Sequence, residues 1–403
     1  MSSPLPDAVA AMLPDLIEWR HDFHRNPELM YELPRTAGLV AERLRAFGFD
    51  EVIEGVGRTG ILGILHGVGG PARDAAGRVL FRADMDALPI REASGVAYAS
   101  SSEGVMHACG HDGHTVMLLG AARALAESRA FAGTIVFCFQ PAEEGGAGAQ
   151  AMIDDGMLDR FPVKAAFALH NWPDMPVGHF GIIHGAAMAS AGGLLIRVEG
   201  VGGHAAQPHK ARDPVVAAAE IVLAAQGIVA RRVDPLETAV ISITSIHGGE
   251  AWNVIPDRVD MKANFRAFNE DTAAILETEL KRICAGVATA HGMRVVAELP
   301  EGAVPYPPTV NHPKETMLAI ASMRAVAGAD RVRDDIRPVT GSEDFAFILR
   351  EVPGAYGFIG NGASSPLHHP GYDFNDEAIG HGVAFWCDLA VRCLPPLAQG
   401  EKV

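Results

Sequence analysis

Apolar strands that alternate with helices and end in polar residues constrain the fold of this chain more than any other feature. Apolar runs at residues 60–65, 78–83, 134–139 and 165–169 are typical of buried strands, and Gly and Pro bound the first two. A helix is predicted at residues 114–128, between the second and third of these strands. Such alternation indicates an α/β domain with a mostly parallel central sheet.

Three of the predicted strands run directly into polar residues at their carboxyl ends, in the segments FRADMD, FCFQPAEE and FALHNW. In open α/β sheets, ligands bind in the crevice outside the carboxyl ends of the strands. We therefore expect one rim of the sheet to collect residues that are far apart in the sequence: Asp84, Asp86, Glu143, Glu144 and His170.

The pattern changes from about residue 190, where strand, helix, two strands, helix and strand follow one another. This β-α-β-β-α-β order matches the ferredoxin-like motif. It predicts a smaller α+β domain at residues 190–301, inserted into a catalytic domain formed by residues 1–189 and 302–403. Two domains also agree with the length of 403 residues.

Charge and composition indicate which classes of partner this chain does not bind. The net charge is −16 at pH 7 with no run of Lys or Arg, which argues against nucleic acid or an anionic membrane bound through bulk charge. No signal peptide is apparent, and charge, Gly or Pro interrupt the long apolar segments before they reach the length of a bilayer span. Five scattered cysteines suit a reducing compartment. We expect a cytoplasmic protein that binds neither nucleic acid nor membrane.

The segment HACGHDGH places Cys109 and His111 two residues apart, just before a predicted helix. A thiolate and an imidazole at this spacing can converge on one metal ion, because Gly110 lets the backbone turn between them. The alternative is a reactive or buried cysteine beside a helix-capping histidine.

The segment PAEE follows another strand with two adjacent carboxylates, Glu143 and Glu144. Because such carboxylates repel each other, an apolar core would not normally hold them without a cation. Adjacent side chains point in different directions, so one can bind a metal ion while the other faces a bound water. A metal-dependent hydrolase requires this division between ligand and general base. The alternative is a solvated pair in a loop.

Further histidines fall in loops of the same kind, namely His170 after FAL and the pair His368–His369 in SPLHHPGYDFND. A lone histidine at a strand end is more often structural than a ligand, so the prediction depends on the convergence of Cys, His and Glu on one rim. Thiolate, imidazole and carboxylate ligands suit Zn, and also Mn, Co or Ni.

These segments together resemble the metal-dependent aminoacylase/carboxypeptidase superfamily. Within it they are most similar to the branch of hippurate hydrolases, N-acyl-amino-acid amidohydrolases and plant auxin-conjugate hydrolases. The resemblance runs from residue 23 to residue 376 and implies a catalytic α/β domain with an inserted lid and dimerisation domain. The matching segments are HRNPEL, FRADMDALPI, HACGHDGHT, QPAEEGGAGA, LHNWP, GGHAAQPH, NVIPD, GSEDF and LHHPGYDFND.

The resemblance implies two divalent metal ions in each subunit. Five ligands for two ions imply a shared ligand or a bridging water. It also implies that Glu143 is the general base and that Asp86 supports the ligands from behind. The family motif of Leu-His, a variable residue and Pro favours His368, with His369 at the variable position. The implied ligands are Cys109, His111, Glu144, His170 and His368.

The resemblance implies roles for the inserted domain as well. His204 matches a histidine that reaches the active site of a partner subunit in relatives and stabilises the developing oxyanion. Asn253 and Arg266 resemble lid residues that hold the substrate carboxylate. His24 of HRNPEL and Glu343 of GSEDF are expected to be mainly structural.

The implied activity is hydrolysis of the amide bond of N-acyl amino acids, by a homodimer or homotetramer, to a carboxylic acid and a free amino acid. The residues leave three alternatives: a metal-free cysteine hydrolase that uses Cys109, a dipeptidase or carboxypeptidase of the same superfamily, and a non-catalytic binding protein. Benzoyl, acetyl, long-chain acyl and indole-acetyl conjugates all occur as substrates among relatives, and no residue of the sequence decides between them.

Overall fold

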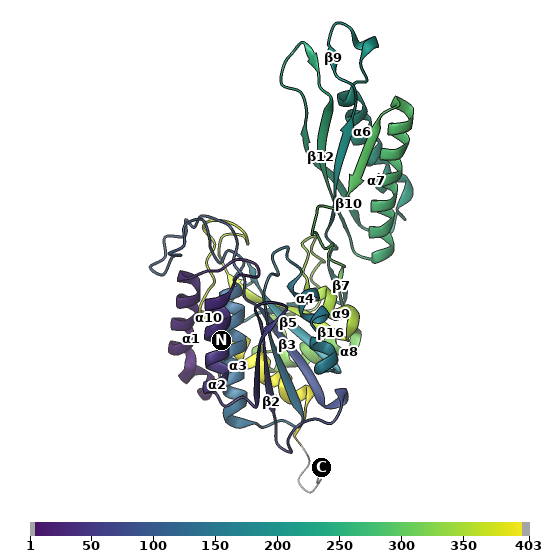
Figure 1. Cartoon of the computed structure of the whole chain (residues 1–403). Helices are drawn as coiled ribbons and strands as arrows, with labels where there is room; N and C mark the ends of the chain where they lie inside the picture. Colours follow the sequence, from purple (N-terminus) through teal and green to yellow (C-terminus); the bar gives the residue numbers. More distant parts are fainter. Residues whose placement is uncertain (1–4, 397–403) are drawn as a thin grey trace. The chain divides into compact units, whose positions relative to one another are not determined.

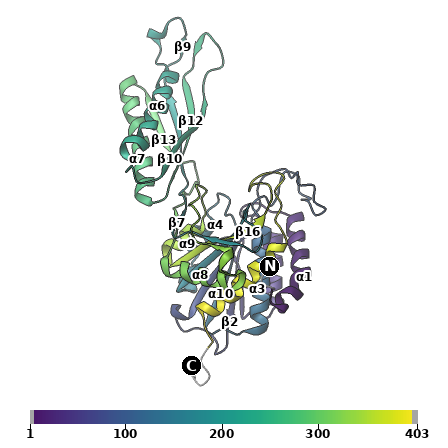
Figure 2. The ribbon, with the colours of Figure 1, turned by 180° about the vertical axis from the view of Figure 1, so that it is seen from behind.

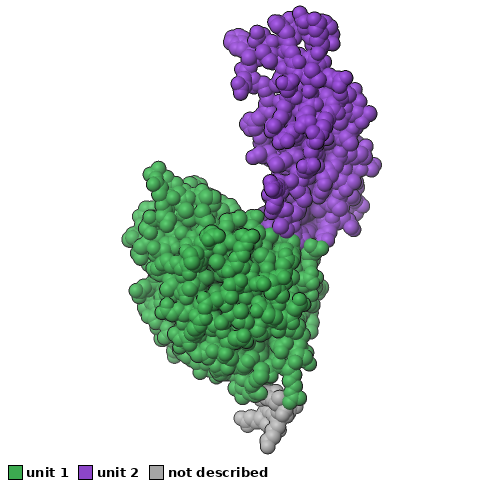
Figure 3. Space-filling view, in the orientation of Figure 1, with its two compact units in different colours: residues 1–187, 310–337, 344–403 green, residues 188–309, 338–343 purple. Residues whose placement is uncertain are grey.

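In the computed structural model, which describes residues 5–396, the chain divides into two compact units (Figure 3). Unit 1 consists of the described residues up to Ala187, together with Val310–Arg337 and the chain from Asp344 onward. Unit 2 consists of Met188–Thr309 and Pro338–Glu343. Unit 2 is therefore an insertion within the sequence of unit 1.

Unit 1 is built on an eight-stranded sheet (Figure 1). Its central strands are parallel: β3 pairs with β4 and β5, and β5 pairs with β16. Antiparallel pairs join β1 to β2, β2 to β4 and β6 to β16. The predicted α/β fold with a mostly parallel sheet is confirmed. In spatial order the strands are β1 (Glu51–Val56), β2 (Gly60–His66), β4 (Thr134–Gln140), β3 (Arg78–Asp84), β5 (Ala165–Pro173), β16 (Gly354–Gly362), β6 (Phe180–Ile182) and β15 (Val332–Arg333).

Helices cover both faces of this sheet, with α1, α2, α3 and α10 on one side and α4 and α9 on the other (Figures 1 and 2). The long helices contact one another, α3 with α1 and α10, and α10 with α8. Nearly every side chain of α3 is buried, which is typical of a central helix. The bounds are α1 (Asp7–Arg25), α2 (Pro34–Ala46), α3 (His111–Ser128), α4 (Gly148–Asp154), α5 (Met157–Arg160), α8 (Pro313–Ala327), α9 (Phe345–Glu351) and α10 (Glu377–Cys393).

Helix α3 begins three residues earlier than the apolar pattern predicts, at His111. Gly110 stands before it with φ of +85°, a left-handed conformation that side chains rarely adopt. A Cβ at this position would lie 2.3 Å from the Asn171 side-chain nitrogen and 2.5 Å from the Tyr372 hydroxyl. Glycine is therefore required at this turn, which brings the Cys109 loop directly onto the rim of the sheet.

Unit 2 is an antiparallel four-stranded sheet with two helices, α6 (Pro214–Arg232) and α7 (Glu270–His291), and has the predicted β-α-β-β-α-β order. Strand β12 alternates as such a sheet requires, because its buried residues face α6 and α7 and its polar residues face away. In spatial order the strands are β10 (Ala239–His247), β12 (Arg258–Ala267), β8 (Gly192–Glu199) and β13 (Arg294–Glu298).

Short elements complete the two units. Strands β9 (Gly203–His204) and β11 (Val254–Ile255) form a small antiparallel ribbon in unit 2, and β7 (Gly185–Met188) pairs with β14 (Thr309–Asn311). Three short 3-10 helices lie in the described connections: η1 (Ala75–Gly77), η2 (Pro208–Lys210) and η3 (Ala329–Arg331).

Helix α6 is the one helix within residues 5–396 that is long and apolar enough to cross a membrane, with a mean hydropathy of 1.5. Glu220 and Gly227 lie within α6, and they are interruptions of the kind that the sequence predicts for the long apolar segments. A single helix of this kind is weak evidence for a membrane span. Ala217, Ile221 and Ala225 of α6 are buried in the core of unit 2, which explains its apolar character.

Candidate active site

The carboxyl ends of the parallel strands in unit 1 gather the predicted metal ligands. Ligand atoms of Cys109, His111 and His170 lie within 4.8 Å of one another, and the same holds for Cys109, Glu144 and His368. His111 also meets this criterion with Glu143 and Glu144. Because the three groups share members, they form one continuous cluster, which we call the rim cluster: Cys109, His111, Glu143, Glu144, His170 and His368.

His111 presents one ring nitrogen to this cluster. Its Nδ1 lies 2.8 Å from the backbone carbonyl oxygen of Asp86, so Nδ1 carries the proton. Its Nε2 is buried and has no hydrogen-bond partner among the described residues. Burial lowers the pKa of His111, but Asp84, Asp86 and Glu144 together raise it to about 10. The surroundings therefore favour a positive charge at Nε2, which a metal ion would supply.

His170 is oriented in the same way. Its Nδ1 donates to the carbonyl oxygen of Asn171 at 2.6 Å, which leaves Nε2 3.4 Å from the Cys109 sulfur. Burial, and then the neighbouring His114, hold the pKa of His170 well below its usual value, so the ring is neutral. A neutral imidazole with a free Nε2 is the form that binds a metal ion.

Cys109 does not have the surroundings of a metal-free nucleophile. Burial raises the pKa of its thiol well above the usual value, and Glu144 and Glu143 raise it further. Catalytic cysteines need the opposite, a lowered pKa beside a positive charge. A bound cation would supply that charge, so the thiolate is favoured here only as a metal ligand.

The two glutamates differ in their contacts. The Oε1 of Glu144 lies 3.2 Å from His368 Nε2 and 3.9 Å from His111 Nε2. Burial raises the pKa of Glu144, but His368 and His111 lower it below its usual value. Glu143 instead accepts from the backbone N–H of Asp344 at 3.4 Å. Glu144 thus faces the other ligands, and Glu143 lies beside them.

Asp86 lies behind the pair of glutamates. Its Oδ1 accepts from the backbone N–H of Glu143 at 3.0 Å, and its Oδ2 accepts from that of Glu144 at 3.1 Å. Both carboxylate oxygens are therefore used to hold the PAEE loop, as expected for a residue that supports ligands.

The two neighbouring histidines of the SPLHHP segment point to different partners. His368 has a positive φ of 64° and directs Nε2 toward Glu144. The Nδ1 of His369 accepts from the backbone N–H of Gly371 at 3.0 Å. Of the two, only His368 meets the distance criterion for the rim cluster among the described residues.

Comparison with known proteins agrees with this geometry. Residues 80–392 match the model of peptidase family M20/M25/M40. The chain belongs to this family. It is 39% identical to the hippurate hydrolase of Campylobacter jejuni over 375 residues, which are 93% of this chain and 95% of the relative. It is 35% identical to an N-acetylcysteine deacetylase of Bacillus subtilis, over 94% of this chain and 97% of the relative.

A solved structure extends the comparison to the metal. A dinuclear metal-binding peptidase of the M20 family from Bacillus subtilis superposes with a TM-score of 0.79 at 31% identity, over 96% of this chain and 100% of that chain. The predicted family and its fold are thus confirmed, and the protein is a metal-dependent hydrolase of the M20 family.

Behind the ligands of this M20 protein lies a polar network that the sequence patterns did not predict. His114 is buried, with Nδ1 2.6 Å from Asp84, and its Nε2 accepts from the backbone N–H of Asn171 at 2.9 Å. The second oxygen of Asp84 accepts from Arg82 at 2.7 Å. Because both nitrogens of His114 and both oxygens of Asp84 are engaged, neither is a free ligand, although both lie near His111.

Asn171 connects this network to the ligand loops. Its side-chain nitrogen donates to the carbonyl oxygen of Cys109 at 2.6 Å, and its side-chain oxygen accepts from the Tyr372 hydroxyl at 2.7 Å. Asn171 and His114 both lie at the ends of predicted motifs, since Asn171 directly follows His170 and His114 is the last residue of HACGHDGH. That adjacency is the signal in the sequence that could have identified them.

His24 of the HRNPEL segment lies in a buried ion-pair network. Its Nδ1 is 2.8 Å from Asp112 and its Nε2 is 3.2 Å from Glu92. Burial lowers the pKa of His24, but the contacts with Asp112 and Glu92 raise it to about 9. Because Asp112 follows His111, these contacts hold the first turn of α3, in agreement with the structural role predicted for this segment.

The three site residues predicted in unit 2 lie at two different ends of that unit's sheet. His204 and Asn253 are exposed and belong to one loop pair, because the carbonyl oxygen of Asn253 accepts from the N–H of Ala205 at 3.0 Å. Arg266 is half-buried near the other end of β12, with Nη1 3.4 Å from the carbonyl oxygen of Ser190. Burial alone lowers its pKa, and no acidic side chain pairs with it among residues 5–396.

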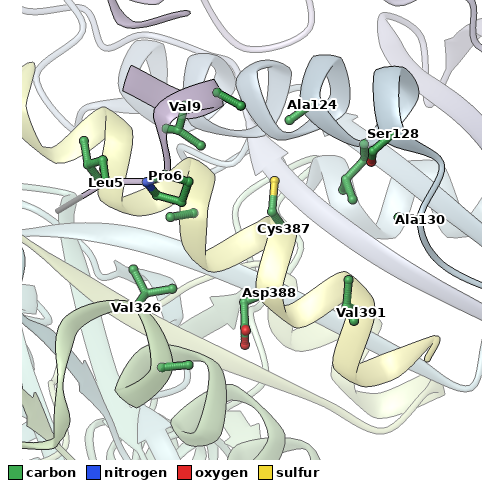
Figure 4. Close-up of a pocket in the computed structure, with 14 residues that line it drawn as sticks. Leu5, Pro6, Val9, Ala124, Ser128, Ala130, Val326, Cys387, Asp388 and Val391 are labelled. Atoms are coloured by element: carbon green, nitrogen blue, oxygen red, sulfur yellow. The ribbon is translucent and has the colours of Figure 1, made fainter. Parts of the chain in front are cut away.

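Unit 1 also contains a mostly apolar cavity of about 480 Å³, between the first residues of α1 and the helices α3, α8 and α10 (Figure 4). Cys387 and Asp388 of α10 line it, together with apolar side chains. None of the residues of the rim cluster lines this cavity.

Proposed function

We propose that this protein hydrolyses the amide bond of N-acyl amino acids and releases a carboxylic acid and a free amino acid. The observation that carries the proposal is the rim cluster, in which two adjacent carboxylates, Glu143 and Glu144, lie among the candidate ligand atoms, so that Glu144 can hold a metal ion while Glu143 serves as the base. A protein that only binds its ligand has no need of such a base.

The donor set fits two divalent metal ions, held by Cys109, His111, Glu144, His170 and His368. The buried Nε2 of His111 has no hydrogen-bond partner among the described residues, and it lies 3.9 Å from Oε1 of Glu144, so the two atoms can share a cation. When bound, such ions polarise the amide carbonyl and lower the pKa of a water toward about 7. Zn, Mn, Co and Ni all suit this mixture of thiolate, imidazole and carboxylate.

Glu143 moves the proton in the proposed reaction. Its carboxylate takes a proton from the attacking water, whose oxygen forms the new bond to the amide carbon. When the carbon–nitrogen bond breaks, Glu143 returns the proton to the departing amine. Two hydrogen bonds hold Glu143 for this task. The backbone N–H of Asp344 donates to the Glu143 carboxylate, and the backbone N–H of Glu143 donates to the Asp86 carboxylate.

We propose that two copies of the chain complete each active site. Strand β12 carries Arg266 near one end, whereas the ribbon with His204 adjoins the other end, at Arg258. Eight residue steps separate Arg258 from Arg266, which is about 27 Å in an extended strand. An N-acyl amino acid is much shorter, so His204 and Arg266 of one copy cannot contact the same substrate molecule. Arg266 would hold the substrate carboxylate in one site, and His204 and Asn253 would serve the site of a second copy.

We also propose that the protein works in the cytoplasm. All five cysteines are free thiols, and four of them are buried, which suits a reducing compartment.

Metal analysis combined with an activity assay tests the proposed function. The purified protein is expected to hold about two divalent ions per chain, to hydrolyse N-benzoyl and N-acetyl amino acids, and to lose activity with a chelator and regain it with Mn or Zn. Activity that survives chelation but is abolished by thiol alkylation would identify a cysteine hydrolase. Cleavage of free dipeptides alone would identify a dipeptidase, and metal binding without turnover of either class would overturn the enzyme assignment.

A further inference from the structure

Trp252 stands out among the exposed apolar side chains of unit 2. Its side chain is fully exposed, at 102% of the reference value, whereas Trp386 of unit 1 is buried at 1%. Tryptophan is usually well buried, because its large apolar surface gains much free energy on leaving water. A fully exposed indole therefore indicates a group that is free to take up a ligand.

The position of Trp252 links it to His204. Val254 pairs with His204 across the β9–β11 ribbon, and Asn253 is bonded through its carbonyl oxygen to the N–H of Ala205. Trp252 is thus next to a residue that the His204 loop holds directly. We call His204, Trp252, Asn253 and Val254 the tip group; all four are exposed.

The orientation of His204 shows what this group can bind. Its Nδ1 accepts from the backbone N–H of Ala206 at 3.1 Å. In the neutral ring the proton is therefore on Nε2, which is left free as a donor for a carbonyl oxygen or an oxyanion. A molecule whose carbonyl meets this donor presents its acyl substituent to the neighbouring side chains, of which Trp252 and the half-exposed Val254 are apolar.

We propose that Trp252 selects the acyl group of the substrate and favours aromatic acyl groups, such as benzoyl or indole-acetyl, over acetyl. The inference rests on the proposed function, because it takes an N-acyl amino acid as the substrate that His204 contacts. An indole ring packs against another aromatic ring in a stacked or edge-to-face arrangement, which gains more free energy than the buried area alone provides. An acetyl group has no ring and cannot make this contact. The acyl group is uncharged, so attraction of a cation to the indole plays no part.

The test compares N-benzoyl-L-alanine with N-acetyl-L-alanine, which differ only in the acyl group. The ratio of their kcat/KM values is expected to fall about tenfold in Trp252→Ala, the scale of one aromatic contact, and to stay near the wild-type ratio in Trp252→Phe. Leu236→Ala is the matched control, because Leu236 is another exposed apolar side chain of unit 2, at 93%, beside the opposite end of the sheet. The ratio should not change in that variant.

A binding measurement gives a second readout. Trp252 is exposed, so its fluorescence should change when N-benzoyl-L-alanine binds to Glu143→Gln, a variant expected to bind substrate without turning it over. The change should be absent when Trp252→Phe is added to that variant. N-acetyl-L-alanine should produce a smaller change at equal occupancy.

Each other outcome is informative. An equal loss for both substrates in Trp252→Ala, or an unchanged ratio, would overturn the acyl-group role. Dissociation of the oligomer in Trp252→Ala, seen by light scattering, would show that Trp252 is a subunit contact and would also overturn it. If the wild type hydrolyses neither substrate, the proposed function fails, and that result is distinct from an unchanged ratio in an active enzyme.

Discussion

The rim cluster of unit 1 and the tip group of unit 2 both contain histidine, but in opposite surroundings. In the rim cluster, His111 and His170 are buried, and each has one ring nitrogen fixed by a backbone carbonyl. In the tip group, the side chains of His204 and Trp252 are exposed. The reacting centre is therefore organised before any ligand binds. The exposed side chains of the tip group, in contrast, must lose bound water when a ligand binds.

The largest effect is expected from the base of the rim cluster. Glu143→Gln keeps the backbone contacts but cannot take a proton, so kcat should fall about 10³-fold or more while the bound metal is retained. Glu144→Gln is the contrasting variant and should lose metal. Metal content by atomic spectroscopy and kcat on N-benzoyl-L-alanine check both. Near-normal turnover in a fully metallated Glu143→Gln would remove Glu143 from the mechanism.

The next largest effect is expected from the polar network behind the rim cluster, and it should lower stability rather than turnover. His114→Ala leaves a buried oxygen of Asp84 and the N–H of Asn171 without partners, so the free energy of unfolding should fall by about 4 kcal/mol. Metal affinity should also fall, by about 10–100-fold, because Asn171 holds the Cys109 loop. Denaturant titration and competition with a chelator measure the two effects. Unchanged metal affinity would show that the network supports only the fold.

The ion pair at the start of α3 should make stability depend on pH. The pKa of His24 is about 9 in the folded protein, against 6.5 for an ordinary histidine. A raised pKa stabilises the fold fully below pH 6.5, and this stabilisation is lost as the pH rises to about 9. It amounts to about 3 kcal/mol at most. The difference in unfolding free energy between wild type and His24→Gln should therefore shrink from pH 6 to pH 9.5, and a constant difference would contradict the assignment.

The smallest effect is expected from Arg266 in unit 2. Arg266→Gln should raise KM about tenfold for N-benzoylglycine and change kcat less, because the arginine would bind the substrate carboxylate equally in the ground and transition states. N-benzoylglycinamide, which lacks that carboxylate, should be little affected. Arg197→Gln removes an exposed arginine of the same sheet and is the control. Equal effects on both substrates would assign Arg266 to another task.

Much of the rim cluster could be predicted from the sequence because its residues occur in short, chemically distinct motifs at strand ends. Cys109 and His111, like Glu143 and Glu144, are near neighbours in the chain, so local spacing reveals them. The contacts of the supporting residues could not be predicted in this way. Asp84, His114 and Tyr372 act through contacts between distant segments, and nothing in their local spacing shows which atoms meet.

The sequence by itself determined the alternation of strands and helices, the order of elements in the inserted unit and the residue types of the rim. These depend on periodicity and composition, which are local properties. Only the tertiary structure decided which nitrogen of each histidine is free, that His368 rather than His369 faces Glu144, and that Arg266 lies far from His204 along β12. These outcomes depend on hydrogen bonds and strand geometry between segments far apart in the chain, which no local pattern records.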